Sequence, residues 1–260
     1  MLRDDRLTGS PIGNRLLRGI IMFLLAAALG ERAFGQVTVT PTSDDTFPFV
    51  VSSTDLLQTN LASAAITGGP GFSFFGTGLL STLIDGNFGA TGTDFGTVVS
   101  FQPATDLTFS FDLTASPAGY DLSQIQTYTG WDTGRDGQEY SLAYSTASAP
   151  GTFIPLASVG PFNVASSTGN GNLRVTISDL LGGTLVSHVA TLRFTFTSFE
   201  NNASAWREFD VIGTPTAVPE PSTAAMATLG LLLLASVAVK RRRQNTRRSR
   251  ATAQALPEKL

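Results

Sequence analysis

Five segments of the chain alternate between apolar and polar residues with a period of two, and a sixth resembles them. The six segments are 107–113, 122–131, 139–145, 173–177, 191–199 and 206–212. In the first of them Leu107, Phe109, Phe111 and Leu113 share one face, and glycine, proline and asparagine separate the segments. Because this alternation is typical of half-buried antiparallel strands, it predicts an all-β fold, an antiparallel β-sandwich of the jelly-roll kind.

The last predicted strand, 206–212, places a carboxylate among apolar residues. Alternation puts Glu208 on the same face as Trp206 and Ile212. If that face points inward, an unpaired Glu208 carboxylate is costly. A bound cation, or the side chain of Arg135 or Arg193, would offset that cost.

The N-terminus carries the marks of an export signal. Arg15 and Arg18 precede the short apolar run 19–29, and Ala33-Phe34-Gly35 supplies small residues before Gln36. A charged start, a short apolar run and a small-x-small site predict a secretory signal peptide over 1–35. The apolar run is shorter than the ~20 residues that span a bilayer.

The C-terminus holds a second apolar run, 224–239, which ends at four consecutive cations, 240–243. As a helix, these 16 residues would cover roughly 24 Å, slightly less than a hydrocarbon core of about 30 Å. Cationic flanks stay on the cytoplasmic side. We therefore expect a sandwich domain over 36–214 outside the inner membrane, a linker over 215–223, a transmembrane helix over 224–239 and a basic cytoplasmic tail over 240–260.

The charge of the exported part differs from that of the whole chain, whose formal net charge is -3. Residues 36–218 contain twelve aspartates and three glutamates against four arginines and no lysine, a net charge of −11. An acidic domain argues against nucleic acid or an anionic membrane as its partner. It is compatible with binding of a divalent cation.

Several kinds of chemistry lack the residues they require. The chain has no cysteine, which excludes disulfides, cysteine-based zinc sites and thiol catalysis. The single histidine, His188, leads into a predicted strand, and no Gly-x-Ser-x-Gly turn is present for a serine nucleophile. Two carboxylates can serve a glycosidase, but fifteen acids make a close pair almost inevitable. We therefore expect a protein that is not an enzyme.

The C-terminal segment resembles a known sorting signal. Residues 218–223, Val-Pro-Glu-Pro-Ser-Thr, precede the apolar run and the arginine cluster in the order found in PEP-CTERM proteins of exopolysaccharide-producing bacteria. The resemblance implies that Pro219, Glu220 and Pro221 form the sorting motif. It also implies processing by an exosortase, a membrane cysteine transpeptidase, with only transient attachment to the inner membrane. A polar tail, 244–260, follows the arginines, where such proteins usually end sooner.

A second resemblance covers roughly 79–213. The segments LIDGNFGATG, YDLSQIQTYTGW, QEYSLAYSTASAPGTFIPLASV, VATLRFTFT and AWREFDVIG follow one another as in galactose-binding-like domains of the discoidin or factor 5/8 type C family. This resemblance implies a jelly roll and a structural Ca²⁺ held by Asp85, Asn87 and Glu208. The alternative for Asp85 is an Asx turn without metal.

The loop 129–140 is the candidate ligand site. Trp131 offers an aromatic face and Arg135 a hydrogen-bonding fork, and Asn201 and Asn202 could join them from a neighbouring loop. Such residues are those that a sugar site needs. The alternative is that Trp131 closes the end of the sandwich and Arg135 pairs with a nearby aspartate.

Together these features predict a secreted protein of the cell envelope or extracellular matrix that binds, or is embedded in, exopolysaccharide. Three alternatives remain open. The protein could be purely structural, with no specific ligand, it could be a glycan-active accessory enzyme, or it could keep its C-terminal helix as a permanent anchor.

Overall fold

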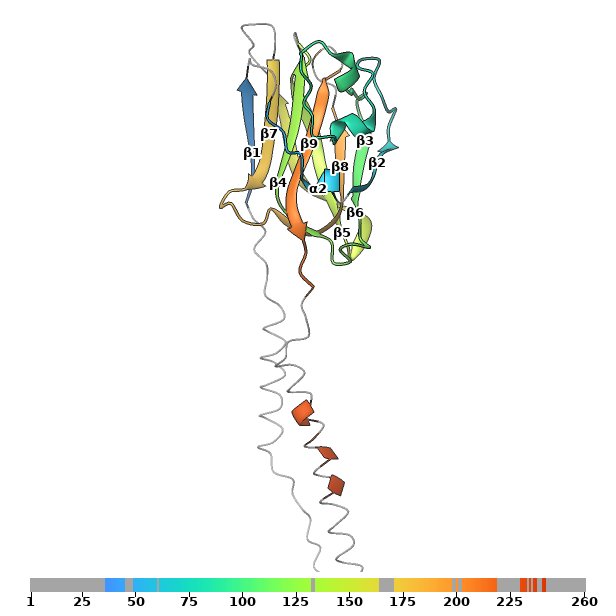
Figure 1. The fold of residues 1–260 in the computed structure, drawn as a ribbon, viewed down its shortest axis with the longest axis vertical. Coiled ribbons are helices and arrows are strands. Elements are labelled where there is room, and N and C mark those ends of the chain that lie inside the picture. Colours follow the sequence, from blue (N-terminus) through green and yellow to red (C-terminus); the bar gives the residue numbers. More distant parts are fainter. Residues whose placement is uncertain are drawn as a thin grey trace, which may run out of the picture. The chain divides into compact units, whose positions relative to one another are not determined.

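The computed structural model describes residues 36–44, 49–59, 61–131, 134–163, 171–197, 200 and 203–218, and the helical positions 230–232, 234, 236–237 and 240–241 (Figure 1). The chain divides into two compact units, Met1–Thr216 and Ala217–Leu260. The predicted signal peptide 1–35, the residues Asn201 and Asn202 and the motif Pro219–Pro221 lie outside the described residues.

The first unit is an antiparallel β-sandwich, as the alternation predicts. Its nine strands are β1 (Val37–Asp44), β2 (Leu61–Gly68), β3 (Asp106–Phe111), β4 (Tyr120–Trp131), β5 (Gln138–Thr146), β6 (Ala149–Phe162), β7 (Gly171–Asp179), β8 (Val186–Phe196) and β9 (Trp206–Pro215). The short helices α2 (Leu56–Thr59), η1 (Leu80–Leu83) and η2 (Phe95–Thr97) lie between β1 and β3 in sequence. Every strand pairing is antiparallel.

The strands form two layers. One layer has the order β1-β7-β4-β9, and the other has the order β6-β5-β8-β3-β2 (Figure 1). They join at one corner, where β4 also pairs with β8 through Tyr120 and Leu122. This corner connection explains why the two layers form a single hydrogen-bonded network.

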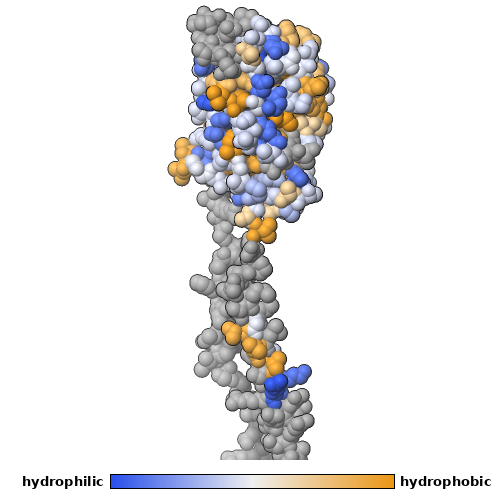
Figure 2. Space-filling model, viewed as in Figure 1, coloured by the Kyte–Doolittle hydropathy of each residue, from blue (hydrophilic) through white to orange (hydrophobic). Residues whose placement is uncertain are grey.

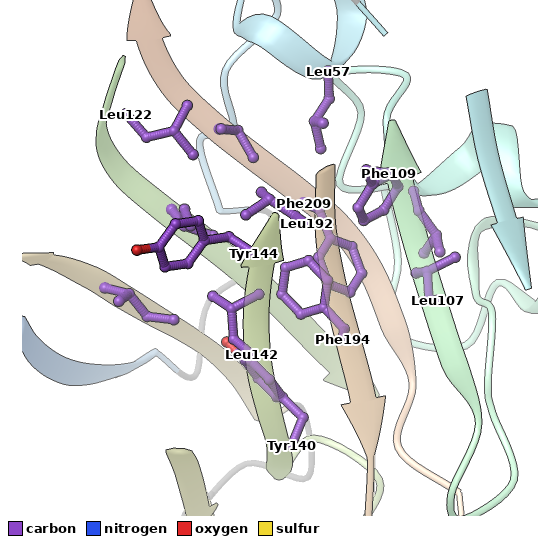
Figure 3. Close-up of a cluster of buried hydrophobic side chains, with 14 of the residues drawn as sticks. Leu57, Leu107, Phe109, Leu122, Tyr140, Leu142, Tyr144, Leu192, Phe194 and Phe209 are labelled. Carbon is purple, nitrogen blue, oxygen red and sulfur yellow. The ribbon is translucent and has the colours of Figure 1, made fainter. Parts of the chain in front are cut away.

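Aromatic rings fill the space between the layers. Phe194 of β8 lies 4.9 Å from Phe209 of β9 and 5.4 Å from Tyr140 of β5, measured between ring centroids, and Phe109 of β3 lies 5.5 Å from Phe209 (Figure 3). All four side chains are buried. Edge-to-face and tilted rings at these spacings add to the free energy of burial itself.

Three strands were not predicted: β1, β2 and β6. Most side chains of β6 are exposed, and β6 lies at the edge of its layer, where β5 is its one partner within the described residues. A strand with little buried surface needs no strict alternation. Proline is tolerated in an edge strand, which has Pro150, Pro155 and Pro161 here.

The sandwich has two distinct ends. Trp131 and Trp206 lie at one end, because Thr129 of β4 pairs with Trp206 of β9, and Tyr120 pairs with Pro215 at the other. We call the first the loop end (residues 71–79, 131, 134–138 and 203–205). We call the second the exit end (residues 112–119, 146–149, 180–185 and 213–216). Strand β9 runs from the loop end to the exit end, where the first unit finishes (Figure 1).

Candidate functional site

Trp131 lies at the loop end with only 7% of its surface exposed. Its ring packs edge-on against Phe75 at 4.8 Å and Phe95 at 4.7 Å, and a small apolar cluster completes its surroundings with Ala203 and Ala205. The indole therefore closes the end of the sandwich. Its face is covered by other side chains, so any aromatic surface offered to solvent here comes from other residues.

Arg135 lies beside this cluster. Its guanidinium carbon is 4.1 Å from the ring centroid of Phe75 and 5.6 Å from that of Phe74, and Nη1 donates to the carbonyl of Ala203 at 3.2 Å. The Arg135 carbonyl accepts from the amide of Ala205 at 2.7 Å. Burial lowers the pKa of the guanidinium, and the charge of Glu200 opposes that shift. The two strand connections, 134–138 and 203–205, are thereby held together on either side of Arg135.

Phe74 is the exposed aromatic residue next to Arg135. Its side chain is 81% exposed, whereas its neighbours Phe72 and Phe95 are each 47% exposed and stack or pack on other rings. The sequence analysis did not identify Phe74. A signal was present in the stretch 71–75, Gly-Phe-Ser-Phe-Phe, where three phenylalanines occur outside any alternating strand pattern. Surrounding glycines and serines made this stretch resemble an ordinary loop.

A pair of carboxyl groups also lies at this end. Asp136 is 3% exposed, and burial, followed by the neighbouring Glu200, raises its pKa to about 7. Glu200 accepts from the amide of Gly137 at 2.8 Å. A side chain at Gly171 would collide with the Asp136 carboxyl, because its Cβ would come within 1.5 Å of Oδ2. This close packing places the Asp136 carboxyl inside the protein and not in an open cleft.

The second predicted site joins the loop after η1 to strand β9. Asp85 accepts from the amide of Asn87 at 2.9 Å, and Asn87 accepts from the amide of Gly89 at 2.9 Å, which makes two successive Asx turns. Glu208 is 0% exposed and accepts a long hydrogen bond, 3.4 Å, from the amide of Gly86. The fold therefore brings Asp85 and Glu208 to one place, while the Asn87 side chain is turned onto its own loop.

The carboxyl group of Glu208 is poorly compensated. Its Oε2 is buried and has no hydrogen-bond partner within the described residues. Burial, and then the charges of Asp210, Asp85 and Asp55, raise its pKa to about 9. The sequence suggested Arg135 or Arg193 as a partner for this carboxyl group. In the structure the Arg135 guanidinium lies over the ring of Phe75 and the Arg193 guanidinium lies over the ring of Phe153.

Two further acids of this cluster were missed by the sequence analysis. Asp55 accepts from the amides of Leu57 at 2.8 Å and Val211 at 3.2 Å. Asp210 accepts from the amide of Ser52 at 2.8 Å and the hydroxyl of Tyr128 at 2.9 Å, and burial raises its pKa to about 6. We call Asp55, Asp85, Glu208 and Asp210 the carboxyl cluster. In the described ranges no set of three or more histidine, cysteine or acidic side chains has the arrangement of a metal site.

Arg207 precedes Glu208 on β9 and is also 0% exposed. Five hydrogen bonds from its guanidinium hold the loop 88–97 and the end of β4. Their acceptors are the Gly130 carbonyl at 2.7 Å, the Thr97 hydroxyl at 2.8 Å and the carbonyls of Phe88, Thr91 and Gly92, each at 3.2 Å. Burial lowers the Arg207 pKa to about 10, so it stays charged at neutral pH.

The face of the sandwich seen in Figure 2 intersperses hydrophilic and hydrophobic residues. Scattered apolar side chains of this kind are normal on a soluble domain and need no partner. The loop end differs from this face, because Phe74 and Arg135 lie next to each other there.

Comparison with known proteins adds two findings. Residues 217–243 match the PEP-CTERM protein-sorting motif. The sandwich is similar to a family 32 carbohydrate-binding module from a family 31 glycoside hydrolase of Clostridium perfringens (TM-score 0.40, 12% identity, covering 59% of this chain and 97% of that chain). It is also similar to the family 32 module of C. perfringens NanJ solved with galactose (TM-score 0.37, 14% identity, covering 61% and 97%). No curated protein sequence matches significantly.

The described positions between 230 and 241 are helical, and Leu231, Leu232 and Leu234 among them are exposed. Within the described part of the chain, no helix is both long enough and apolar enough to cross a membrane. The chain carries a PEP-CTERM protein-sorting motif at residues 217–243, directly after the end of its antiparallel β-sandwich.

Proposed function

We propose that this protein is exported, sorted through its PEP-CTERM motif, and binds extracellular polysaccharide with the loop end of its sandwich. The observation that carries the proposal is the exposed ring of Phe74, 81% accessible, beside the Arg135 guanidinium 5.6 Å away. A sugar ring needs an aromatic face for its apolar side and fixed hydrogen-bond donors for its hydroxyl groups. Phe74 and Arg135 supply both.

The packing beneath these two residues supports the proposal. Arg135 is fixed by its contact with Phe75 and its bond to the Ala203 carbonyl, and Trp131 fills the space behind Phe75. Binding therefore requires little ordering of the arginine, which reduces its entropic cost. In this proposal Trp131 supports the site, and Asn201 and Asn202, which lie between Glu200 and Ala203 in the sequence, remain proposed as further ligand residues.

The arrangement of the two ends of the domain is consistent with this role. The chain leaves the sandwich at the exit end, after Pro215, whereas Phe74 and Arg135 lie at the loop end. A site at the loop end therefore lies at the end of the sandwich opposite the point where the chain leaves it. A polysaccharide can then be bound both before and after the motif is processed.

For the C-terminal segment we infer processing by an exosortase at or near Pro219-Glu220-Pro221. The inner membrane would hold the protein only until that step. The processed protein would then belong to the cell envelope or the extracellular matrix.

We also propose a structural Ca²⁺ at Asp85 and Glu208. The Oε2 of Glu208 has no hydrogen-bond partner among the described residues and is set among three other carboxyl groups. This supports the proposal, because a positive charge would offset both burial and mutual repulsion. Two carboxylates are fewer than calcium requires, so backbone carbonyls of the loop, and Asn87 after rotation of its side chain, would complete the site. The ion would hold the loop and take no part in catalysis.

The test is binding of the purified protein to extracellular polysaccharide from the bacterium that produces the protein, measured by calorimetry. Phe74→Ala should weaken binding about tenfold or more. Val50→Ala, which changes another exposed apolar residue (88% accessible), should not. Equal binding by both variants would reject the loop end as the site. Absence of binding by the wild type would favour a purely structural role.

A further inference from the structure

The outer face of the layer β6-β5-β8 contains a hollow of about 430 Å³, within the range of ~300–1,000 Å³ common for small-molecule sites. It lies where β6 carries a bulge, since Leu142 pairs with Ala157 but Ala143 pairs with Pro155. The lining residues are Ser141, Leu142, Ala143, Pro155, Leu156, Ala157, Ser158, Arg193 and Thr195. Small side chains across β5 and β6 leave this space open.

Arg193 stands out among these lining residues. Its guanidinium carbon lies 4.0 Å from the ring centroid of Phe153, so the ring holds the guanidinium from one side. The Nε atom is buried and has no hydrogen-bond partner in the part of the chain that the structure describes. Because the guanidinium is fixed by the ring and the residue lines the hollow, it is placed to pair with an acceptor that a ligand brings.

The other three arginines of the described domain also lie over aromatic rings, and each of them interacts electrostatically with an acid. The charge of Asp94 acts on Arg207, that of Glu200 acts on Arg135, and Arg174 acts on Asp210. Arg193 also lies over a ring, and in addition it lines the hollow. This arrangement suits an anionic group that arrives with the ligand.

Hydroxyl groups complete the lining. Ser141 and Ser158 face each other as a pair across β5 and β6, and both are exposed. Thr195 donates its hydroxyl proton to Asp106 at 2.5 Å, so its oxygen remains an acceptor toward the hollow. Short side chains that both donate and accept are suited to the hydroxyl groups of a sugar.

We propose that this hollow binds an acidic sugar, with Arg193 paired to the sugar carboxylate and Ser141, Ser158 and Thr195 bonded to its hydroxyl groups. Arginine and carboxylate form the strongest type of side-chain hydrogen-bonded pair, because the guanidinium fork matches two oxygens. The negative charge of the domain as a whole acts over longer distances and is screened beyond about 10 Å at 0.1 M salt. The short-range pair then decides which sugar binds.

This site is separate from the loop end and does not depend on it. The two differ in their residues and in their surroundings: an exposed ring beside Arg135 at the loop end, and Arg193 among hydroxyl groups in the hollow. A polysaccharide with acidic units could therefore contact the protein at both places, and variants at one place should leave the other intact.

The experiment compares oligogalacturonate with the same oligosaccharide after its carboxylates are reduced to alcohols, using the purified full chain at 0.15 M salt. The wild type should bind the acidic form at least tenfold more tightly. Arg193→Gln should remove that preference with an unchanged melting temperature. Asp106→Asn, which keeps an acceptor for Thr195 but removes a nearby negative charge, should strengthen binding of the acidic form severalfold.

Val50→Ala, at an exposed apolar residue outside both sites, serves as the control and should leave the preference for the acidic form unchanged. Phe74→Ala tests the contribution of the loop end separately. The proposal is overturned if the wild type binds both forms equally or binds neither. It is also overturned if the preference persists in Arg193→Gln. A loss of preference in Phe74→Ala together with its retention in Arg193→Gln would assign acidic-sugar binding to the loop end instead.

Discussion

Arg207 and Glu208 are adjacent on β9 and both are fully buried, but their surroundings differ. Within the described residues, Arg207 donates five hydrogen bonds to the loop 88–97 and the end of β4. Over the same residues Glu208 accepts one long bond, and its other oxygen has no partner among the neighbouring acids. A buried charge is tolerated when its hydrogen-bonding groups are satisfied. The hydrogen bonds of Arg207 therefore compensate its buried charge, whereas the Glu208 carboxyl group requires a proton or a cation.

The largest expected effect on the free energy of unfolding comes from removing the hydrogen bonds of Arg207. Arg207→Ala removes a donor from five acceptors, several of them buried, and should lower the free energy of unfolding by about 3–5 kcal/mol. Urea denaturation measures this change. Arg207→Lys keeps the charge but cannot reach all of these acceptors, so it should recover only part of the loss. An Arg207→Ala protein as stable as the wild type would show that the loop is held by other contacts.

The next effect is a pH dependence that arises from the carboxyl cluster. Because the folded pKa of Glu208 is raised from 4.5 to about 9, its contribution to stability is complete below about pH 4.5 and is lost as pH rises toward 9. Asp136 and Asp210, with pKa values raised to about 7 and about 6, act in the same direction. In chelator, the free energy of unfolding should fall by roughly 2–4 kcal/mol between pH 5 and pH 8.

Glu208→Gln is the matched variant for this prediction. The amide keeps the shape and cannot ionise, so the variant should be more stable than the wild type at pH 8 in chelator and should show a smaller pH dependence. A wild-type protein that becomes more stable between pH 5 and pH 8 in chelator would contradict the raised pKa of Glu208.

A smaller effect, on the melting temperature, distinguishes a bound proton from a bound cation as the partner of the Glu208 carboxyl group. At pH 8, calcium should raise the melting temperature of the wild type by several degrees, which corresponds to about 1–2 kcal/mol. Asp85→Asn and Glu208→Gln should abolish that rise. An identical melting temperature in calcium and in EDTA would remove the proposed ion and leave a protonated Glu208.

The smallest effect on stability is expected at the loop end. Phe74 is exposed, so Phe74→Ala should change the free energy of unfolding by no more than about 0.5 kcal/mol. Phe75→Ala, at the next position but buried, should cost about 3–5 kcal/mol. Differential scanning calorimetry of the two variants tests whether Phe74 is free for a ligand. A large loss in Phe74→Ala would give it a structural role instead.

Alternation along the chain was sufficient to predict the sandwich, because each inner strand buries one face and must alternate. It could not predict β6, whose exposed position imposes no such pattern. The approach of Asp85 to Glu208 was expected only from a family resemblance. Asp55 joins them from a segment about 150 residues away from β9, and no local pattern encodes that contact.

Arg207 illustrates a second limit. Four of its five acceptors are backbone carbonyls, which every residue possesses, so no residue type marks them in the sequence. Trp131 and Phe74 illustrate a third. Both are aromatic residues near glycines, and only the packing of the loop end shows that one is covered and the other exposed.

The most direct test of the proposed function is calorimetric titration of extracellular polysaccharide from the bacterium that produces the protein into the wild-type protein and into Phe74→Ala, with both proteins shown to melt at the same temperature. We expect measurable heat and saturable binding for the wild type, and an affinity about tenfold or more lower for Phe74→Ala. Equal affinities, or no binding by the wild type, would contradict polysaccharide binding at the loop end.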